Sequence, residues 1–503
     1  MIRKWTEHSM YLHHLELEIS SLSIPEKNRL FRMHHVSLLK LTLLNLDNLF
    51  PVVKPLYPVL GRPAKNQCEL LRSLILMIDF KKQSITDWAF ATEHDDLLRI
   101  MCGFRKDDVP GTASYYDLLE RLWLSTRSKN RTKIRKFKRK PSKKYKANSK
   151  LPNRRPGVVG RLVNAFQNGK LPDIRPEKIL QEILKYAVVE TSASLGLLGN
   201  TDSMSISVDG STYYAGSSPY GTRVCDCKDR GIHRCDCARK YADVDASWGW
   251  DSYRECYFWG DALFSVTAAD SINDLPIYLQ SAQASRHDGV SSVFAIRNVL
   301  SLYPKFKLHK FLADGAMDDY SIYEMLSKLG IQPFIPLPNN TKFPRLDDYP
   351  EILEFNEKGT PICRAGLPWA YWGYDGKKRR HKYRCPRAVK HDAGIKCFTC
   401  AECNKSKSDY GPSIYLKSSN DVRLYPPVLR HTGQFKEVFK RRSGVERTFK
   451  RIFEDYQVEA YKARSRAVRF SLAVFAAINM HLDAWVQNIS ALPNNITLLM
   501  ALA

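Results

Sequence analysis

Acidic residues are scarce in this chain: 52 aspartates and glutamates stand against 78 lysines and arginines, and the formal net charge is +26. This excess of cations predicts a polyanionic partner. Nucleic acid is the first candidate, because neutralising its phosphates releases condensed counterions. Long apolar runs are also missing, since no stretch reaches the roughly 18 uninterrupted apolar residues of a membrane span. The nearest run, Phe470–Met480, is shorter and follows Arg469, so we expect a buried helix there and no membrane partner.

The first residues lack the apolar stretch and the small-residue cleavage site of a signal peptide. We therefore expect the protein to work in the cytoplasm, associated with the nucleoid, where thiols stay reduced. Its 12 cysteines then favour metal binding or core packing over disulfide bonds. At 503 residues and 44% hydrophobic content, the chain can bury a large core and hold several domains.

Shifts in residue pattern divide the chain into five regions. The first predicts successive short helices, which suit either a helix-turn-helix DNA-binding module or a helical cap with no role in DNA binding. The second is too basic and too poor in apolar residues to form a core, which predicts a linker or an arm that contacts phosphates. Its expected DNA contacts are Arg135, Lys136, Arg139 and Lys140. The predicted divisions are a helical DNA-binding region (1–126), the basic arm (127–156), the first part of a catalytic domain (157–336) with a cysteine-rich insertion at about 217–247, an insertion domain (337–433) and a helical carboxyl-terminal part (434–503).

Three acidic residues stand where metal ligands are expected. Asp209 follows the alternating run 203–208, and Asp314 follows the short apolar run 311–313, so both are predicted at strand ends. Glu446 lies in a predicted helix. These carboxylates, far apart in sequence, can converge on two Mg²⁺ (or Mn²⁺) ions, which activate water and stabilise an in-line displacement at phosphorus. The alternative for each acid alone is an ordinary turn or helix cap, which is the role we assign to His287-Asp288.

The helix around Glu446 places cations beside that carboxylate. Arg442 and Lys450 fall four residues before and after it, on one helical face. Such a face suits a metal ligand flanked by phosphate-binding groups. A surface ladder of ion pairs is the alternative.

Two sets of cysteines have spacings that suit zinc. The first set contains two C-x-C pairs separated by seven residues: Cys225, Cys227, Cys235 and Cys237. The second set lies in the predicted insertion domain: Cys385, Cys397, Cys400 and Cys403. Four thiolates can close a tetrahedral structural Zn²⁺ site in each region. The alternative is a group of reduced cysteines in loops.

Together these motifs resemble the insertion-sequence DDE transposases, whose catalytic domain is RNase H-like. The motifs that carry the resemblance are 208–210 (VDG), 313–318 (ADGAMD) and 441–447 (RRSGVER), and it extends from about Gly61 to Trp485. It implies a mixed α/β (α+β) fold: an RNase H-like core with a mixed sheet, a helical amino-terminal domain and a loop- and β-rich insertion that bears cysteines. It also implies that Asp209, Asp314 and Glu446 coordinate the metals.

The resemblance assigns further DNA contacts. It makes Arg442 a contact to phosphate near the cleaved bond. Many relatives carry tyrosine and lysine where this chain has Phe439 and Phe453, and Lys450 is the candidate substitute for that lysine. The insertion would contact the transposon end, where Trp372 and its neighbouring cations could stack a displaced base. The alternative for this tryptophan is the aromatic core of a small β domain.

The implied function is DNA transposition. The protein would bind terminal inverted repeats, cut a DNA strand at the element end and transfer the exposed 3′-hydroxyl to target DNA, with a homodimer bridging two ends. Two other functions fit the residues: a metal-dependent DNA nuclease, and an inactive or repurposed zinc-containing DNA-binding protein.

Overall fold

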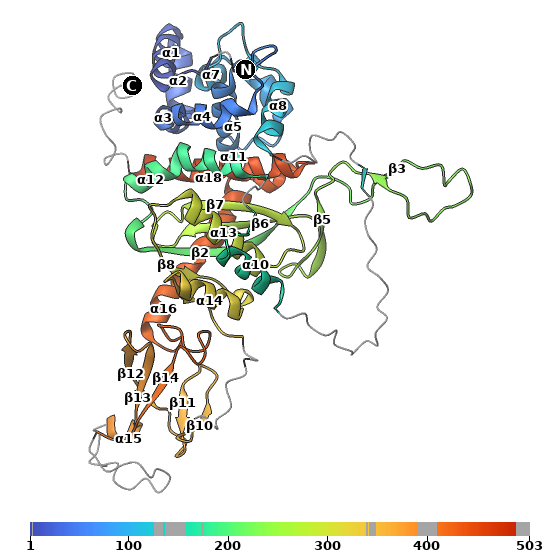
Figure 1. Cartoon of the computed structure of the whole chain (residues 1–503). Helices are drawn as coiled ribbons and strands as arrows, with labels where there is room; N and C mark the ends of the chain where they lie inside the picture. The colour runs from blue at the N-terminus through green and yellow to red at the C-terminus, as the bar shows by residue number, and fades with distance from the viewer. Residues whose placement is uncertain are drawn as a thin grey trace.

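The computed structural model describes residues 1–2, 4–124, 134–135, 156–172, 176–338, 341, 349–389 and 410–488. Figure 1 shows a layer of helices from the amino-terminal part above a central mixed sheet, with a smaller group of strands below it. A narrow lobe that contains β3 projects sideways from the sheet (Figure 1). The predicted mixed α+β fold is confirmed.

Short helices make up the amino-terminal layer. Their apolar residues recur at intervals of three and four, so each helix buries one side against its neighbours. Helix α5 is buried along almost its whole length, with Leu70, Leu71, Leu74 and Ile75 in the core. The helices are α1 (His8–Ser21), α2 (Ile24–Met33), α3 (His35–Leu43), α4 (Phe50–Val53), α5 (Gln67–Asp79), α6 (Ile85–His94), α7 (Asp96–Cys102) and α8 (Thr112–Leu122).

The central sheet combines antiparallel and parallel strands. Its members are β2 (Met204–Tyr214), β5 (Ser247–Asp251), β6 (Cys256–Ala268), β7 (Pro276–Gln283), β8 (Leu308–Leu312) and β9 (Gln332–Phe334). The order is β5-β6-β2-β8-β9, with β7 also paired to β6. Strands β2, β6 and β7 are antiparallel neighbours, whereas β8 and β9 run parallel to β2. Helices α13 (Asp288–Leu302) and α14 (Tyr320–Lys328) connect β7 to β8 and β8 to β9.

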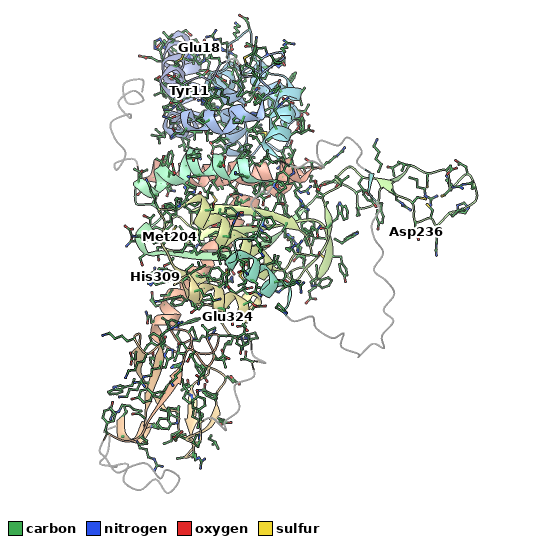
Figure 2. The ribbon with its side chains drawn as sticks, in the orientation of Figure 1. Tyr11, Glu18, Met204, Asp236, His309 and Glu324 are labelled. Atoms are coloured by element: carbon green, nitrogen blue, oxygen red, sulfur yellow. The ribbon has the colours of Figure 1, made fainter. Side chains whose placement is uncertain are left out.

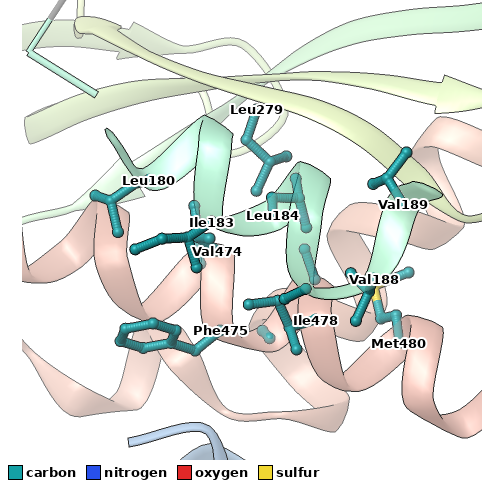
Figure 3. Packing of buried hydrophobic residues seen from close by; sticks show 14 of the residues in the cluster. Leu180, Ile183, Leu184, Val188, Val189, Leu279, Val474, Phe475, Ile478 and Met480 are labelled. Carbon is teal, nitrogen blue, oxygen red and sulfur yellow. The ribbon is translucent and has the colours of Figure 1, made fainter. Parts of the chain in front are cut away.

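One long apolar helix joins the helical layer to the sheet. Helix α18 (Arg466–Gln487) packs against α3, α5 and α8 and also contacts α11 (Lys178–Leu184) and β7. Figure 3 shows Val474, Phe475 and Ile478 of this helix among Leu180 and Ile183 of α11. The π-helical segment η3 (Lys185–Val189) and α12 (Glu190–Ser194) continue α11. The run that was predicted as a buried helix is therefore at the centre of the core.

A buried charge network fixes α18 to strand β6 of the sheet. The Arg469 guanidinium, with its side chain 1% exposed, donates to Asp261 of β6 at 2.8 Å through Nε. Its Nη1 lies 2.8 Å from the carboxylate of Asp243. Arg466 also pairs with Asp261, through Nη2 at 2.6 Å. Because a buried charge is stable only when it is paired, this network requires all of its members.

The remaining elements lie outside the central sheet. Strands β1 (Ile134–Arg135), β3 (Thr222–Arg223) and β4 (Arg239–Lys240) form a ribbon in the order β1-β4-β3. The insertion contains β10 (Ile352–Phe355), β11 (Pro361–Cys363), β12 (Ala370–Asp375), β13 (Arg380–Arg384), α15 (Pro386–Val389) and β14 (Ser413–Lys417). Helix α10 (Val158–Gln167) packs against α13 and α14. The chain then returns to the sheet through α16 (Gly433–Phe439), the 3₁₀ turn η8 (Lys440–Arg442) and α17 (Ser443–Lys450).

Among the described residues, no single helix combines the length and the apolarity needed to cross a membrane. By length and composition alone, one pair that is bent by 57°, His35–Leu43 with Asp47–Leu56, meets the test as a broken span.

Candidate active site

Two aspartates meet at the point where β8 ends beside β2. In this parallel pair, Ser207 of β2 lies opposite Leu312 of β8. Asp209 and Asp314 each follow these partners by two residues, so the register brings both carboxylates to the same place. The Asp209 side chain accepts a hydrogen bond from the Gly210 amide at 2.9 Å, and Asp314 accepts one from the Ala316 amide at 3.0 Å. Both side chains are therefore oriented by local backbone donors.

The prediction that a strand ends at Asp209 is wrong. Strand β2 continues to Tyr214, because β6 keeps pairing with it as far as Gly260. Asp209 lies opposite Ser265 within this antiparallel ladder. The parallel pairing of β2 with β8 does end near Asp209, since its last pair is Ser207 with Leu312. The Asp209 carboxylate therefore lies where the two strands separate.

Helix α17 carries Glu446 and packs against β2 and β6. Arg447 holds the helix in place, because its guanidinium donates to both oxygens of Asp274 in the β6–β7 turn at 2.6 and 2.8 Å. Gly444 permits the close approach, since a Cβ there would lie 2.6 Å from an Asp274 oxygen. Thr448 adds a bond to the Asp274 carbonyl at 3.0 Å.

Arg442 links the helical glutamate to the strand aspartate. Its Nη1 lies 3.2 Å from Asp209, and its Nη2 donates to the Glu446 carboxylate one turn along the helix. The side chains of Asp209 and Arg442 are largely buried, at 17% and 18% exposure, whereas Glu446 is 52% exposed. Arg442 thus links two of the predicted ligands, Asp209 and Glu446. The third, Asp314, lies beside Asp209.

Asp288 is a fourth carboxylate in this place, and sequence reasoning assigned it to helix capping. The cap of α13 is instead His287, whose Nδ1 accepts from the Gly289 amide at 3.1 Å. The Asp288 carboxylate lies against Gly210 so closely that a Cβ on this glycine would be 2.2 Å from its Oδ1. Only the tertiary contact between α13 and β2 reveals this placement. The one sequence signal was an acid that follows β7 directly at a helix start.

Burial and a neighbouring carboxylate both oppose ionisation of two acids in this site. Burial, followed by the neighbouring Asp314 carboxylate, raises the pKa of Asp209 to about 7, although Arg442 opposes the shift. Burial and Asp314 likewise raise the pKa of Asp288 to about 6. Carboxylate oxygens gathered in this way are the ligands that Mg²⁺ and Mn²⁺ prefer. The donor types therefore suit divalent cations, although these carboxylates are not drawn together as tightly as the cysteine cluster, whose ligand atoms all lie within 4.8 Å of one another.

The residues that depart from the resemblance have packing roles. Phe439 stacks on Phe435, with ring centroids 5.4 Å apart. Phe453 lies edge-on to Tyr213 at 5.2 Å and parallel to Phe449 at 6.1 Å. Lys450 is exposed one turn beyond Glu446.

The insertion exposes an aromatic and cationic face. Lys382 and Arg384 alternate along β13 with the buried His381 and Tyr383. Lys382 is partly exposed, whereas Arg384 is only 9% exposed and packs against the rings of Trp372 and Tyr410. Trp372, 50% exposed, lies under the Arg384 guanidinium at 4.3 Å. Trp369 is the tryptophan that is buried in the small core of this region. The aromatic residues thus divide between core and surface, and Trp372 lies on the surface.

The first set of cysteines forms a cluster in the projecting lobe. The ligand atoms of Cys225, Cys227, Cys235 and Cys237 all lie within 4.8 Å of one another. Hydrogen bonds from the cluster, first from the backbone of Cys227, lower the pKa of Cys225 to about 7.

Several predicted site residues cannot be placed. Cys385 is buried in the insertion. Its proposed partners Cys397, Cys400 and Cys403 lie outside the described residues. The same holds for Lys136, Arg139 and Lys140, whereas the backbone of Arg135 forms part of β1.

Comparison with known proteins gives one match. Residues 263–480 match the family model described as a transposase DDE domain. The match contains Asp288, Asp314 and Glu446 and begins within β6, so Asp209 precedes it. No curated protein and no solved structure matches the chain. The resemblance inferred from the motifs is thus confirmed over residues 263–480, which match the transposase DDE domain.

Proposed function

We propose that the protein is an insertion-sequence transposase that cuts DNA at the element ends and joins those ends to target DNA. The observation that carries this proposal is the convergence of Asp209 and Asp314 from adjacent parallel strands, with Glu446 tied to Asp209 through Arg442. The family match supports the general chemistry, which is transposition on a DNA substrate. Inverted-repeat recognition, strand cleavage and strand transfer are the specific steps that we assign.

The order of the strands supports an RNase H-like core. Taken in chain order, the strands β2, β6, β7, β8 and β9 lie side by side as 3-2-1-4-5, with the first three antiparallel and the last two parallel to the first. The short strand β5 pairs with the first residues of β6, on the same side on which β7 pairs with its later residues. This arrangement places the first and fourth strands together, which is what brings Asp209 to Asp314.

The residues of the site would hold two Mg²⁺ or Mn²⁺ ions. Asp209, Asp314 and Glu446 are the assigned ligands, and Asp288 is close enough to share them. Bound divalent ions supply an activated water and stabilise charge on the attacking and leaving oxygens. Arg442 lies between Asp209 and Glu446, where its guanidinium can turn to a non-bridging oxygen of the scissile phosphate.

DNA would extend over three other surfaces. The basic arm suits binding of the inverted repeats, because it is dense in lysine and arginine and has no acidic residue. The helical layer is assigned to the same DNA by its succession of short helices. The outer face of β13 offers Lys382 to the backbone and Trp372 to an unstacked base, with the buried Arg384 supporting the Trp372 ring. Because two element ends must be joined to one target, we assign a homodimer to the active complex.

The decisive experiment separates cleavage from binding. Asp209→Ala, Asp314→Ala and Glu446→Ala should each abolish Mg²⁺-dependent nicking of DNA that carries the element end, while binding of that DNA is retained. Asp202→Asn is the matched control, because this acid is 76% exposed and lies in the 3₁₀ turn (Thr201–Ser203) that precedes β2, outside the site. Full activity in any of the three variants removes that residue from the site.

A second assay distinguishes transposition from simple hydrolysis. End DNA with a free 3′-hydroxyl is supplied already cut, together with a supercoiled target. A transposase joins the two, whereas a nuclease yields no joined product. Absence of both nicking and joining, with end binding intact, would favour the inactive DNA-binding protein.

A further inference from the structure

The Sγ atoms of the four cysteines of the lobe all lie within 4.8 Å of one another. The Sγ atoms of Cys225 and Cys235 are 3.6 Å apart, and so are those of Cys227 and Cys237. A disulfide would require about 2.0 Å. Zinc–thiolate bonds of about 2.3 Å place two sulfurs about 3.8 Å apart in a tetrahedral site. The observed separations therefore match a shared metal and exclude cystine geometry.

The lobe has no hydrophobic core of its own. Residues 222–240 are all described, and none of them belongs to a hydrophobic cluster. Val224 and Ile232 are 50% and 46% exposed. A segment of this size without a core needs a metal or a covalent link to fold. A tight turn brings the second C-x-C pair back, because the Ile232 amide donates to the Cys227 carbonyl at 2.8 Å.

The cluster lies at the end of a very short ribbon. Cys225 follows β3 and Cys237 precedes β4, each by two residues. The other end of the ribbon is anchored on the sheet, where the Tyr241 ring stacks on Trp259 at 6.3 Å. Figure 2 shows Asp236 out in this lobe, far from Met204 and His309 on the sheet. Between the two ends, each strand has only two residues.

Strand β4 is the centre of this ribbon and carries the basic arm on its free edge. Lys240 and Arg239 pair with Thr222 and Arg223 of β3 on one side. On the other side the same residues pair with 134–135 of β1, which come from the basic tract about a hundred positions earlier. Ladders of two residues are too short to persist alone. The pairing of β1 thus depends on whatever keeps β3 and β4 in register.

We propose that Cys225, Cys227, Cys235 and Cys237 bind one Zn²⁺ in a closed structural site, and that this metal clip holds β4 as the edge on which the basic arm docks. We assign zinc because a set of four cysteines is a common ligand set of structural Zn²⁺ sites. Four protein ligands complete the tetrahedral shell, so no position is left open for catalysis. The inference deepens the structural part of the proposed function. Its tests need no DNA, so their failure is distinct from a failure of strand cleavage.

Metal content tests the first half. Wild-type protein should contain one more equivalent of Zn²⁺ than a variant in which all four cysteines are serine. Cys256→Ser is the matched control: this thiol is exposed on β6, outside the cluster, and its loss should leave zinc unchanged. Equal zinc in the wild type and the four-serine variant overturns the site, and so does iron in place of zinc.

Amide exchange tests the second half on the natural chain. Zinc is removed from wild-type protein with a chelator and then restored, and exchange is followed in peptides that contain 134–135 and 239–240. We expect protection of both segments with zinc, loss of protection without it and recovery on reloading, while β2 and β6 stay protected throughout. Exchange at 134–135 that is the same with and without zinc overturns the docking role.

Discussion

Burial of Asp209 beside the Asp314 carboxylate should make the protein less stable as the pH rises, and Asp209→Asn should remove that loss. Burial and the Asp314 carboxylate raise the pKa of Asp209 to about 7 from its ordinary 3.8. Asparagine keeps the shape of the side chain and its neighbours Gly210 and Arg442, but it cannot ionise. The difference in unfolding free energy between wild type and variant therefore isolates the cost of this one charge.

The sign follows from proton linkage. Below about pH 4 the carboxyl of Asp209 is protonated in both the folded and the unfolded chain, so it adds no cost. Between pH 4 and 7 the unfolded chain releases its proton first, and stability falls as the pH rises. Above pH 7 the full cost is present. A pKa raised from 3.8 to about 7 corresponds to a loss of about 4 kcal/mol across this window.

Urea unfolding, followed by tryptophan fluorescence from pH 4.5 to 8.5, measures the difference. Samples are prepared without added Mg²⁺ and without chelator, because a chelator would also strip the cysteine cluster. The wild type should lose stability relative to Asp209→Asn up to pH 7, and Mg²⁺ at pH 8 should restore it only in the wild type. Asp202→Asn serves as the exposed control and should show no such trend. A pH-independent difference between wild type and Asp209→Asn would refute the reasoning.

Three further predictions follow from contacts in and beside the site. Asp288→Asn should raise the Mg²⁺ concentration for half-maximal nicking by about 10- to 100-fold, as losses around a metal site do; an unchanged Mg²⁺ dependence would exclude Asp288 from the site. Gly210→Ala should cost about 1–3 kcal/mol of stability, since its Cβ would lie 2.2 Å from Asp288 Oδ1. That cost should shrink in an Asp288→Ala background, and equal costs in both backgrounds would contradict the contact. Arg469→Met should destabilise the fold by about 3–5 kcal/mol in urea unfolding, because it leaves Asp243 and Asp261 buried with too few cations; a smaller change would show that the carboxylates find other partners.

Sequence patterns predicted the strand aspartates because both signals are local. Alternation before Asp209 and the short apolar run before Asp314 mark strands, and strands of this kind became β2 and β8. Neither pattern shows that the two strands are parallel neighbours with Ser207 opposite Leu312. That register comes from packing across a hundred residues, and it is what makes two separate acids into one site.

The features that sequence reasoning missed are all long-range contacts. Asp288 looked like a helix-start acid because its neighbour Gly210 lies on another element. The pairing of β1 with β4 is equally invisible, since two-residue strands carry no periodicity. Trp369 and Trp372 lie three residues apart, and only the packing of the insertion determines that Trp369, just before β12, is buried while Trp372, on β12, is exposed.

The charge balance of the site connects its fold with the proposed chemistry. Asp209, Asp288, Asp314 and Glu446 bring four negative charges near one another, and Arg442 is the cation that bridges two of them. Two divalent ions would match four carboxylates and would compete with Arg442 for Asp209 and Glu446. The guanidinium would then be released toward the DNA phosphate, whose charge it can pair. In this proposed arrangement Arg442 would stabilise the metal-free site and then contact the substrate, so metal binding and DNA binding would reinforce each other.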